Sequence, residues 1–343
     1  MRIGGIGAFS ATVALAAAGA FLFLLMGFPV PFLTGPALIV SLAAMVGVPV
    51  VIPAGLRDAC FIVLGLGIGS SITQDVVLTA ARWPLSLAIL AVCVVASLKI
   101  CDWILRRVFR YDPLTALLAS TPGHLSFALA LSVERGADSA RVGMVQGIRV
   151  LFLTLCVPPM IGIGLGDVAL PAGRPEMALP HLAALAAAAL ALGLVFLRLR
   201  VPAAYLLAAM AVSATGHLAG VTPGTPPFVL TALAFVTMGA LIGARFRGMT
   251  PTDLRGVLLA GIAVTGVTVV FAGLGALATM ALLGLPVRTL LVAFAPGGLE
   301  AMAAIAVELG LNPALVAAHH VWRLVFLSVL VPWLVLRLDR RMR

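Results

Sequence analysis

Charge is scarce in this sequence. Of its 343 residues only 10% are charged, whereas 62% are hydrophobic, and the mean hydropathy is +1.20. The surface of a soluble globular domain needs far more charge, so this composition excludes a soluble fold. Apolar runs of roughly 18 to 25 residues follow one another, each long enough to cross a hydrocarbon core of about 30 Å as a helix. The composition predicts an all-α, polytopic membrane protein.

Motifs for catalysis are missing as well. The sequence has no Walker loop, no H-E-x-x-H and no G-x-G-x-x-G that opens a helix after a strand. The four cysteines lie in or beside apolar segments without metal-binding spacing, which predicts packing roles. Among the five histidines only His319 and His320 are adjacent, and neighbouring helical side chains point about 100° apart. We therefore expect no metal, no cofactor and no enzymatic activity.

Basic residues exceed acidic ones, 22 to 12, which gives a net charge of +10. They are dispersed in short loops beside apolar segments rather than gathered in one patch. This placement is typical of the positive-inside rule for membrane proteins and not of DNA binding. We expect the lipid bilayer as a partner and no direct contact with nucleic acid.

An internal duplication organises the chain. Between 122–158 and 296–332, a shift of 174 positions aligns 14 identical residues out of 37 without a gap. In a chain of such apolar composition, about one position in ten would be identical by chance. The observed match is much higher and indicates an internal repeat. Each copy carries Pro-Gly, a glutamate and an arginine at fixed spacing, and glycines of the third apolar segment match at the same shift. We expect the glycines of these two segments to allow close helix packing rather than to contact a solute directly; they are Gly65, Gly67, Gly69, Gly239 and Gly243.

Six apolar segments are expected in each half of the chain. The predicted organisation is a first membrane repeat at 1–165, a Gly- and Pro-rich linker at 166–180 and a second membrane repeat at 181–343. The expected segments are 8–28, 32–50, 56–73, 84–108, 113–133 and 140–165, followed by 182–199, 202–221, 228–246, 254–283, 289–309 and 314–336.

The distribution of positive charge along the chain predicts which segments cross the membrane. If all twelve segments crossed, the basic clusters after the fourth segment and after the ninth segment would lie on opposite sides, which the positive-inside rule disfavours. If the fifth segment of each half is re-entrant, 17 of the 22 basic residues fall on or toward the cytoplasmic side and three outside. We therefore predict two inverted repeats, each with about five crossing helices and one broken or re-entrant segment. Both termini are predicted to be cytoplasmic, and a broken helix that crosses remains the alternative.

The Pro-Gly pairs interrupt the fifth segment of each half. Proline lacks an N–H, so the helix loosens there, and in lipid the freed backbone groups need protein, water or a solute as partners. Two matched breaks in two inverted halves are the sequence sign of a transporter site at the repeat interface, whereas one alone would indicate a packing kink. The candidate solute-binding residues at the breaks are Thr121, Pro122, Gly123, His124, Ser126, Pro296, Gly297, Gly298 and Glu300.

An arginine follows each break. Arg149 and Arg323 lie nine residues into the last helix of each half, about 13 Å deep at 1.5 Å per residue. Such buried cations need partners, either structural ion pairs with Glu134 and Glu308 or with Glu300, or an anionic solute. Each new helix would also begin after the break and favour an anion at its N-terminus. Gln146 and His320 lie about one turn before the arginines and complete the candidate site.

These motifs resemble a known family. The Thr121-Pro-Gly and Ala295-Pro-Gly-Gly segments with their downstream glutamates and arginines, together with 30–36 and 239–243, are similar to the AbrB family of bacterial membrane proteins with a duplicated AbrB domain. The resemblance implies an inner-membrane protein of inverted repeats, and the family is similar in plan to cation:proton antiporters and anion transporters. Family labels include AbrB family transcriptional regulator and ammonia monooxygenase.

Three functions remain open at this point. The residues favour a secondary transporter or exporter of a small, anionic metabolite, coupled to protons or cations. A membrane-embedded regulator or sensor that affects gene expression is the alternative, and a membrane monooxygenase ranks last because no ligand cluster for a metal is present. Whether the protein forms a homo-oligomer is left open.

Overall fold

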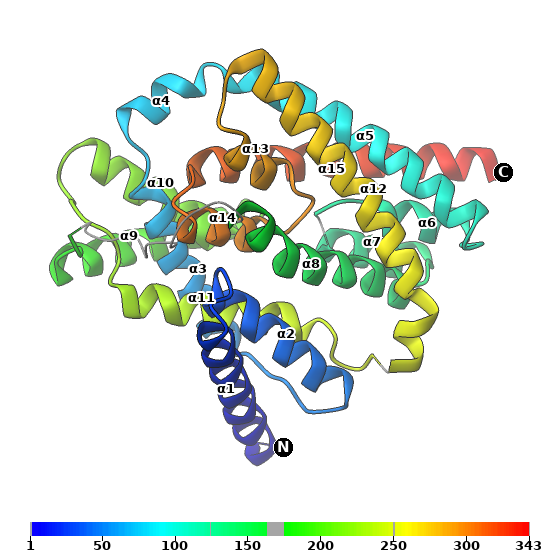
Figure 1. The fold of residues 1–343 in the computed structure, drawn as a ribbon, viewed down its shortest axis with the longest axis horizontal. Helices are drawn as coiled ribbons and strands as arrows, with labels where there is room; N and C mark the ends of the chain where they lie inside the picture. Colours follow the sequence, from blue (N-terminus) through cyan, green and yellow to red (C-terminus); the bar gives the residue numbers. More distant parts are fainter. Residues whose placement is uncertain (1, 124, 163–174, 250, 343) are drawn as a thin grey trace. The chain divides into compact units, whose positions relative to one another are not determined.

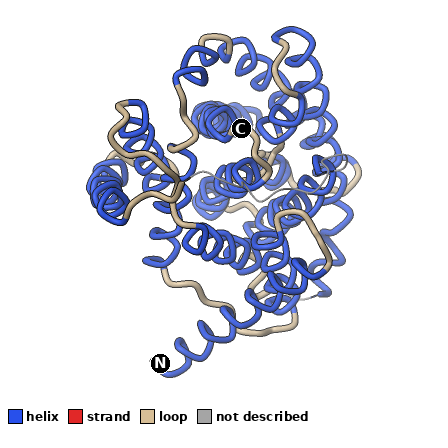
Figure 2. Tube along the Cα trace, turned by 60° about the vertical axis from the view of Figure 1, so that its left-hand side comes forward, coloured by secondary structure: helices blue, strands red, loops and turns tan. Residues whose placement is uncertain are grey.

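The protein is all-helical. The computed structural model describes residues 2–123, 125–162, 175–249 and 251–342, and this part of the chain contains fifteen α-helices and no strand. Figures 1 and 2 show these helices and the loops that connect them. Six helices of the described residues are long and apolar enough to cross a membrane: α1 (Arg2–Leu25), α5 (Trp83–Arg107), α8 (Ser139–Gly162), α9 (Leu179–Arg198), α12 (Pro251–Leu283) and α15 (Pro313–Met342). Large apolar side chains on them are exposed, for example Val92 at 68% and Leu259 at 70%, as expected of surfaces that contact lipid. An all-helical fold with six such helices is consistent with a polytopic membrane protein.

The chain divides into two compact units. The first contains 1–81, 154–247 and 300–316, and the second contains 82–153, 248–299 and 317–343. Each unit therefore draws helices from both halves of the sequence, although the repeats predicted above divide the chain near its middle.

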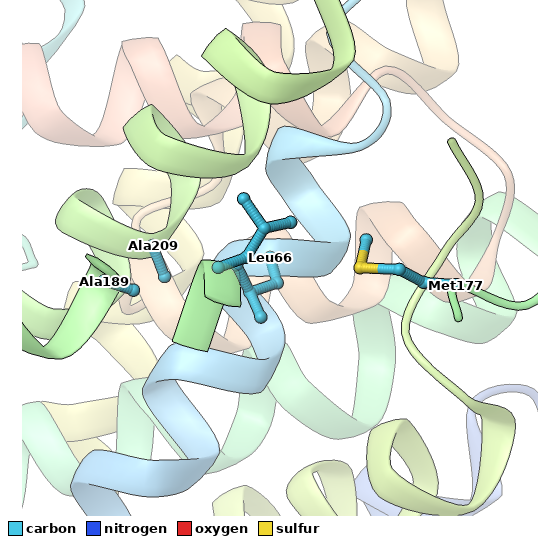
Figure 3. Packing of buried hydrophobic residues seen from close by; sticks show 5 residues of the cluster. Leu66, Met177, Ala189 and Ala209 are labelled. Carbon is cyan, nitrogen blue, oxygen red and sulfur yellow. The ribbon is translucent and has the colours of Figure 1, made fainter. Parts of the chain in front are cut away.

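In the first unit, helices from the first half of the sequence pack against helices from the second half. Its helices are α1 (Arg2–Leu25), α2 (Pro31–Met45), α3 (Ala54–Gly69), α4 (Gln74–Ala80), α9 (Leu179–Arg198), α10 (Ala204–Leu218), α11 (Phe228–Ala244) and nearly all of α14 (Leu299–Glu308). Helix α3 packs on α10, and α11 packs on α2. Figure 3 shows Leu66 of α3 with Ala189 of α9 and Ala209 of α10 in a buried apolar cluster.

Glycines allow the helices of these two pairs to approach each other closely. A Cβ atom on Gly65 of α3 would meet the backbone oxygen of Leu206, and one on Gly239 of α11 would meet that of Leu33. The two contacts are equivalent under the repeat, since each half offers its third helix to the second helix of the other half. The predicted packing role is confirmed at Gly65, Gly69, Gly239 and Gly243 but is wrong for Gly67, where an added Cβ atom would have no heavy atom within 4 Å.

The second unit holds the broken segment of the first half. Its helices are α5 (Trp83–Arg107), α6 (Pro113–Ser120), α7 (Leu125–Arg135), α12 (Pro251–Leu283), α13 (Val287–Phe294) and most of α8 (Ser139–Gly162) and α15 (Pro313–Met342). Helix α12 packs closely through two glycines: Gly261 lies against Ile148 of α8, and Gly275 lies against Phe294 of α13 and Cys93 of α5.

The duplication is visible in the helix boundaries. Helices α6, α7 and α8 begin at positions 113, 125 and 139, and α13, α14 and α15 begin at 287, 299 and 313, each 174 positions later. The expected segments 113–133 and 289–309 are both split into two helices, so the predicted breaks are confirmed.

Some expected segments differ from the observed helices. Helix α2 ends at Met45 rather than near position 50, because the chain turns at Gly47 with φ +90°. The expected segment 56–73 ends at Gly69, and the short helix α4 that follows was not predicted. Thr73 begins α4 by accepting a hydrogen bond from the Val76 N–H at 3.4 Å, a helix N-cap that its sequence permits.

Candidate functional site

The two breaks share one backbone cause. Thr121 and Ala295 each precede a proline and are extended, with φ/ψ of −65°/117° and −53°/133°. The Cδ of a proline clashes with a helical conformation of the residue before it, so α6 ends at Ser120 and α13 at Phe294. In the first break Gly123 adds a φ of +81°, which L side chains rarely adopt. Each break thus exposes carbonyl groups that no helical N–H can reach.

The two arginines bind these carbonyl groups. Arg149 Nη2 donates a hydrogen bond to the Thr121 oxygen at 3.0 Å, and Arg323 Nη1 donates one to the Ala295 oxygen at 2.6 Å, each across 28 residues. The two bonds are equivalent under the repeat. Arg323 Nη2 also donates to the Gly297 oxygen at 2.6 Å. Both arginines are almost completely buried, at 0% and 2% exposure. The arginine that follows each Pro-Gly pair in the sequence therefore has the same structural role in both halves: it binds the carbonyl group of the residue before the proline.

Arg323 also reaches the break of the first half. A Cβ atom on Gly123 would lie 2.8 Å from Arg323 Nε, and the positive charges of Arg149 and Arg323 are close enough to repel each other. Arg323 Nε is buried without a hydrogen-bond partner, and the part of the chain that the structure describes offers Arg323 no carboxylate within ion-pair distance. Two cations close together in a region of low dielectric constant create a site that an anion would stabilise.

A small cavity lies beside both breaks. Pro122, Pro296 and Arg323 line it, and Ser97 and Thr268 add two hydroxyl groups. Its volume is about 10 Å³, which is room for roughly one water molecule. The two Pro-Gly breaks and an arginine thus meet in one place within the second unit, with very little space between them.

The second unit contains further buried polar side chains. Gln146 Nε2 donates to the Leu118 oxygen at 3.0 Å, and the repeat-equivalent His320 is also fully buried. His319, which sequence analysis did not place in the site, lies 2.9 Å from Ser86 Oγ and against the ring of Phe294. Ser86 and His319 are 233 residues apart, and no sequence pattern links them.

The remaining candidates are distributed between the units. Glu134 is exposed at the end of α7 and contacts Arg135 at 3.4 Å. Glu300 is in the first turn of α14, where it interacts electrostatically with Arg245, and Glu308 is buried at the end of that helix. These two glutamates belong to the first unit, so their pairing with the arginines stays a prediction. Gly298 precedes α14, while His124 and the side chain of Ser126 lie outside the described residues.

The comparison with known proteins decides the family. The model of the family described as transition state regulatory protein AbrB matches residues 32–338. The chain belongs to the AbrB family. This AbrB family protein is 30% identical over 322 residues, covering 88% of each chain, to a protein of Escherichia coli (strain K12) whose name describes it as a candidate regulator, AbrB. It is 23% identical over 350 residues to the uncharacterized protein YhjN of Bacillus subtilis (strain 168), covering 93% of this chain and 90% of that one.

Proposed function

We propose that this AbrB family protein is a secondary transporter or exporter of a small anionic metabolite, which binds between the two broken helices. The observation that carries the proposal is that Arg149 and Arg323, both buried and close together, hold the carbonyl groups of two repeat-related breaks beside one cavity. Broken helices at matched positions of two repeats mark solute sites in transporters.

The charges favour an anion. Helix α7 has no acidic residue in its first turn, whereas α14 has Glu300 there. The N-terminus of a helix attracts negative charge, and at α14 a carboxylate of the protein already fills this role. We therefore place the anion nearer to α7, next to Gly123 and the unpartnered Nε of Arg323. Glu300 is then the candidate acceptor for a coupled proton or cation.

The small volume of this cavity implies that the broken segments move when a solute binds. Room for about one water molecule does not admit a metabolite, so the breaks must separate before a solute binds. Contacts exchanged reciprocally between the halves, Gly65 with Leu206 and Gly239 with Leu33, are the pattern of a two-fold relation between repeats. With an odd number of crossings per half, such repeats would be inverted and would allow alternating access to the two sides of the membrane.

Flux measurements test the proposal. Inside-out vesicles with the wild-type protein should take up one or more radiolabelled organic acids, and Arg149→Ala or Arg323→Ala should reduce the rate at least about tenfold. Arg107→Ala, which removes an exposed arginine at the end of α5, is the matched control and should keep the wild-type rate. The amount of folded protein in the vesicles is measured for each variant. Unchanged flux in both buried-arginine variants would sink the proposal.

A membrane-embedded regulator or sensor of gene expression is the second candidate, because the family description and the name of the E. coli relative refer to regulation. In that case the same cavity would bind a solute and report it to a cytoplasmic partner. Copurification of one specific partner, together with no flux for any acid tested, would favour the regulator over the transporter.

A further inference from the structure

A basic groove lies in the second unit, away from the two breaks. We use this name for the cavity of about 230 Å³ between α5, α6 and α15 whose charged residues are Lys99, Asp102, Arg106 and Arg337. The three residues of α5 are spaced three and four positions apart, so they lie on one face of that helix. Neither the arginines of the breaks nor the Pro-Gly motifs contribute to this groove.

The charges of the groove do not cancel. Asp102 binds Arg106 at 2.9 Å, which satisfies that pair. Lys99 forms no hydrogen bond or ion pair with any residue that the structure describes, and the guanidinium of Arg337 lies over the ring of Trp333, 5.4 Å from its centroid. Two cationic side chains therefore remain for a negatively charged ligand.

The other walls of the groove are apolar. Leu98 and Leu117 line it from α5 and α6, and Leu334 and Leu338 line it from α15. A free inorganic ion gains nothing from leucines. A molecule with a charged end and a hydrocarbon body matches both kinds of wall.

The position of the groove fits the membrane boundary. Lys99 lies eight residues before the end of α5 at Arg107, about 12 Å along the axis at 1.5 Å per residue. Trp103 and Trp333, on the two helices that flank the groove, are exposed at 59% and 53%. Exposed tryptophans gather at the headgroup level of a bilayer, and lysines near helix ends extend their ammonium groups toward that level.

We infer that the basic groove binds the headgroup of an anionic phospholipid, whose phosphate contacts Lys99 and Arg337 and whose acyl chains extend along the leucines. Basic pockets between transmembrane helices on the cytoplasmic side are suited to such headgroups. The positive charges of these helix ends predict the cytoplasmic leaflet as the source of the lipid. This inference is independent of solute transport, because the groove and the breaks share no residue.

Thermal unfolding of the full chain in detergent tests the inference. Phosphatidylglycerol should raise the melting temperature of the wild type by a few degrees, since a ligand that binds only the folded state stabilises it. Phosphatidylcholine at the same concentration should not. Lys99→Gln/Arg337→Gln should need roughly ten times more phosphatidylglycerol for half of the shift.

The matched control is Arg198→Gln/Arg255→Gln, which removes the same charge from two exposed positions outside the groove and should respond like the wild type. Native mass spectrometry of copurified phosphatidylglycerol gives a second readout, with the single variants Lys99→Gln and Arg337→Gln if the double variant does not fold. An equal shift with phosphatidylcholine or inorganic phosphate would overturn the inference, as would an equal loss of lipid binding in the control.

Discussion

Gly123 lies directly against Arg323: a Cβ atom on this glycine would come within 2.8 Å of the arginine Nε. The same guanidinium donates hydrogen bonds to the oxygens of Ala295 and Gly297. One side chain therefore contacts the break of the first half and holds the break of the second. Arg323 is also buried, so its side chain has little room to move away from either broken segment.

Gly123→Ala tests this contact. An alanine at φ +81° is strained, and its methyl group would also push the guanidinium away from its carbonyl partners. We expect the variant to be less stable than the wild type by about 2–4 kcal/mol, measured by thermal or denaturant unfolding in detergent.

Gly136→Ala is the control for Gly123→Ala. Gly136 has a similar φ of +72°, but a Cβ atom added to it would have no heavy atom within 4 Å. Its loss should be limited to the backbone strain of about 1–2 kcal/mol. Equal losses in the two variants would show that the contact with Arg323 contributes nothing.

Gly65→Ala tests the close packing of α3 and α10. The new methyl group would meet the backbone oxygen of Leu206, which cannot rotate away. We expect a loss of stability of about 1–3 kcal/mol, and the same for the repeat-equivalent Gly239→Ala against Leu33. Gly67→Ala, on the same helix with open space around it, should instead gain about 0.5–1 kcal/mol. Unfolding curves that rank the variants otherwise would contradict the glycine contacts.

The breaks and the repeat were predictable from the sequence for local reasons. A proline acts on its own residue and on the one before it, so Pro122 and Pro296 determine where α6 and α13 end wherever the helices lie. Glycines at matched spacing likewise indicate close packing without naming the partner helix. These are short-range effects that a sequence pattern records.

The partners of the site residues were not predictable. Ser86 contacts His319 across 233 residues, and Gly123 contacts Arg323 across two repeats. Such contacts depend on how the helices of the two halves pack within each compact unit. The residue types alone do not indicate which helices pack together. The short helix α4 was missed because seven residues are too few for an apolar period to appear.

Arg323→Lys separates charge from geometry at the site. Lysine keeps the positive charge but has one nitrogen, which cannot replace the planar fork that reaches Ala295 and Gly297 together. We expect a loss of about 1.5–3 kcal/mol in unfolding experiments and a reduced solute flux. Arg107→Lys, at an exposed position, should change neither. A lysine variant that keeps full stability and flux would show that only the charge matters.

Whether the broken segments cross the membrane or are re-entrant determines the topology of the protein. Cysteine labelling from each side of the membrane can distinguish the two cases. In a background without Cys60, Cys93, Cys101 and Cys156, single cysteines replace Asp112 and Ala137 around the first broken segment, and Arg288 and Leu311 around the second. Positions 136 and 310 are glycines with positive φ, so their neighbours are the better sites.

If the segments are re-entrant, an impermeant maleimide should label positions 112 and 137 from the cytoplasmic side only, and positions 288 and 311 from the opposite side only. That result would make the number of crossings per half odd and the repeats inverted. If positions 112 and 137 are labelled from opposite sides, the first broken segment crosses the membrane. The positive charges that follow α5 and α11 would then lie on opposite sides, against the positive-inside rule, and alternating access through inverted repeats would lose its basis.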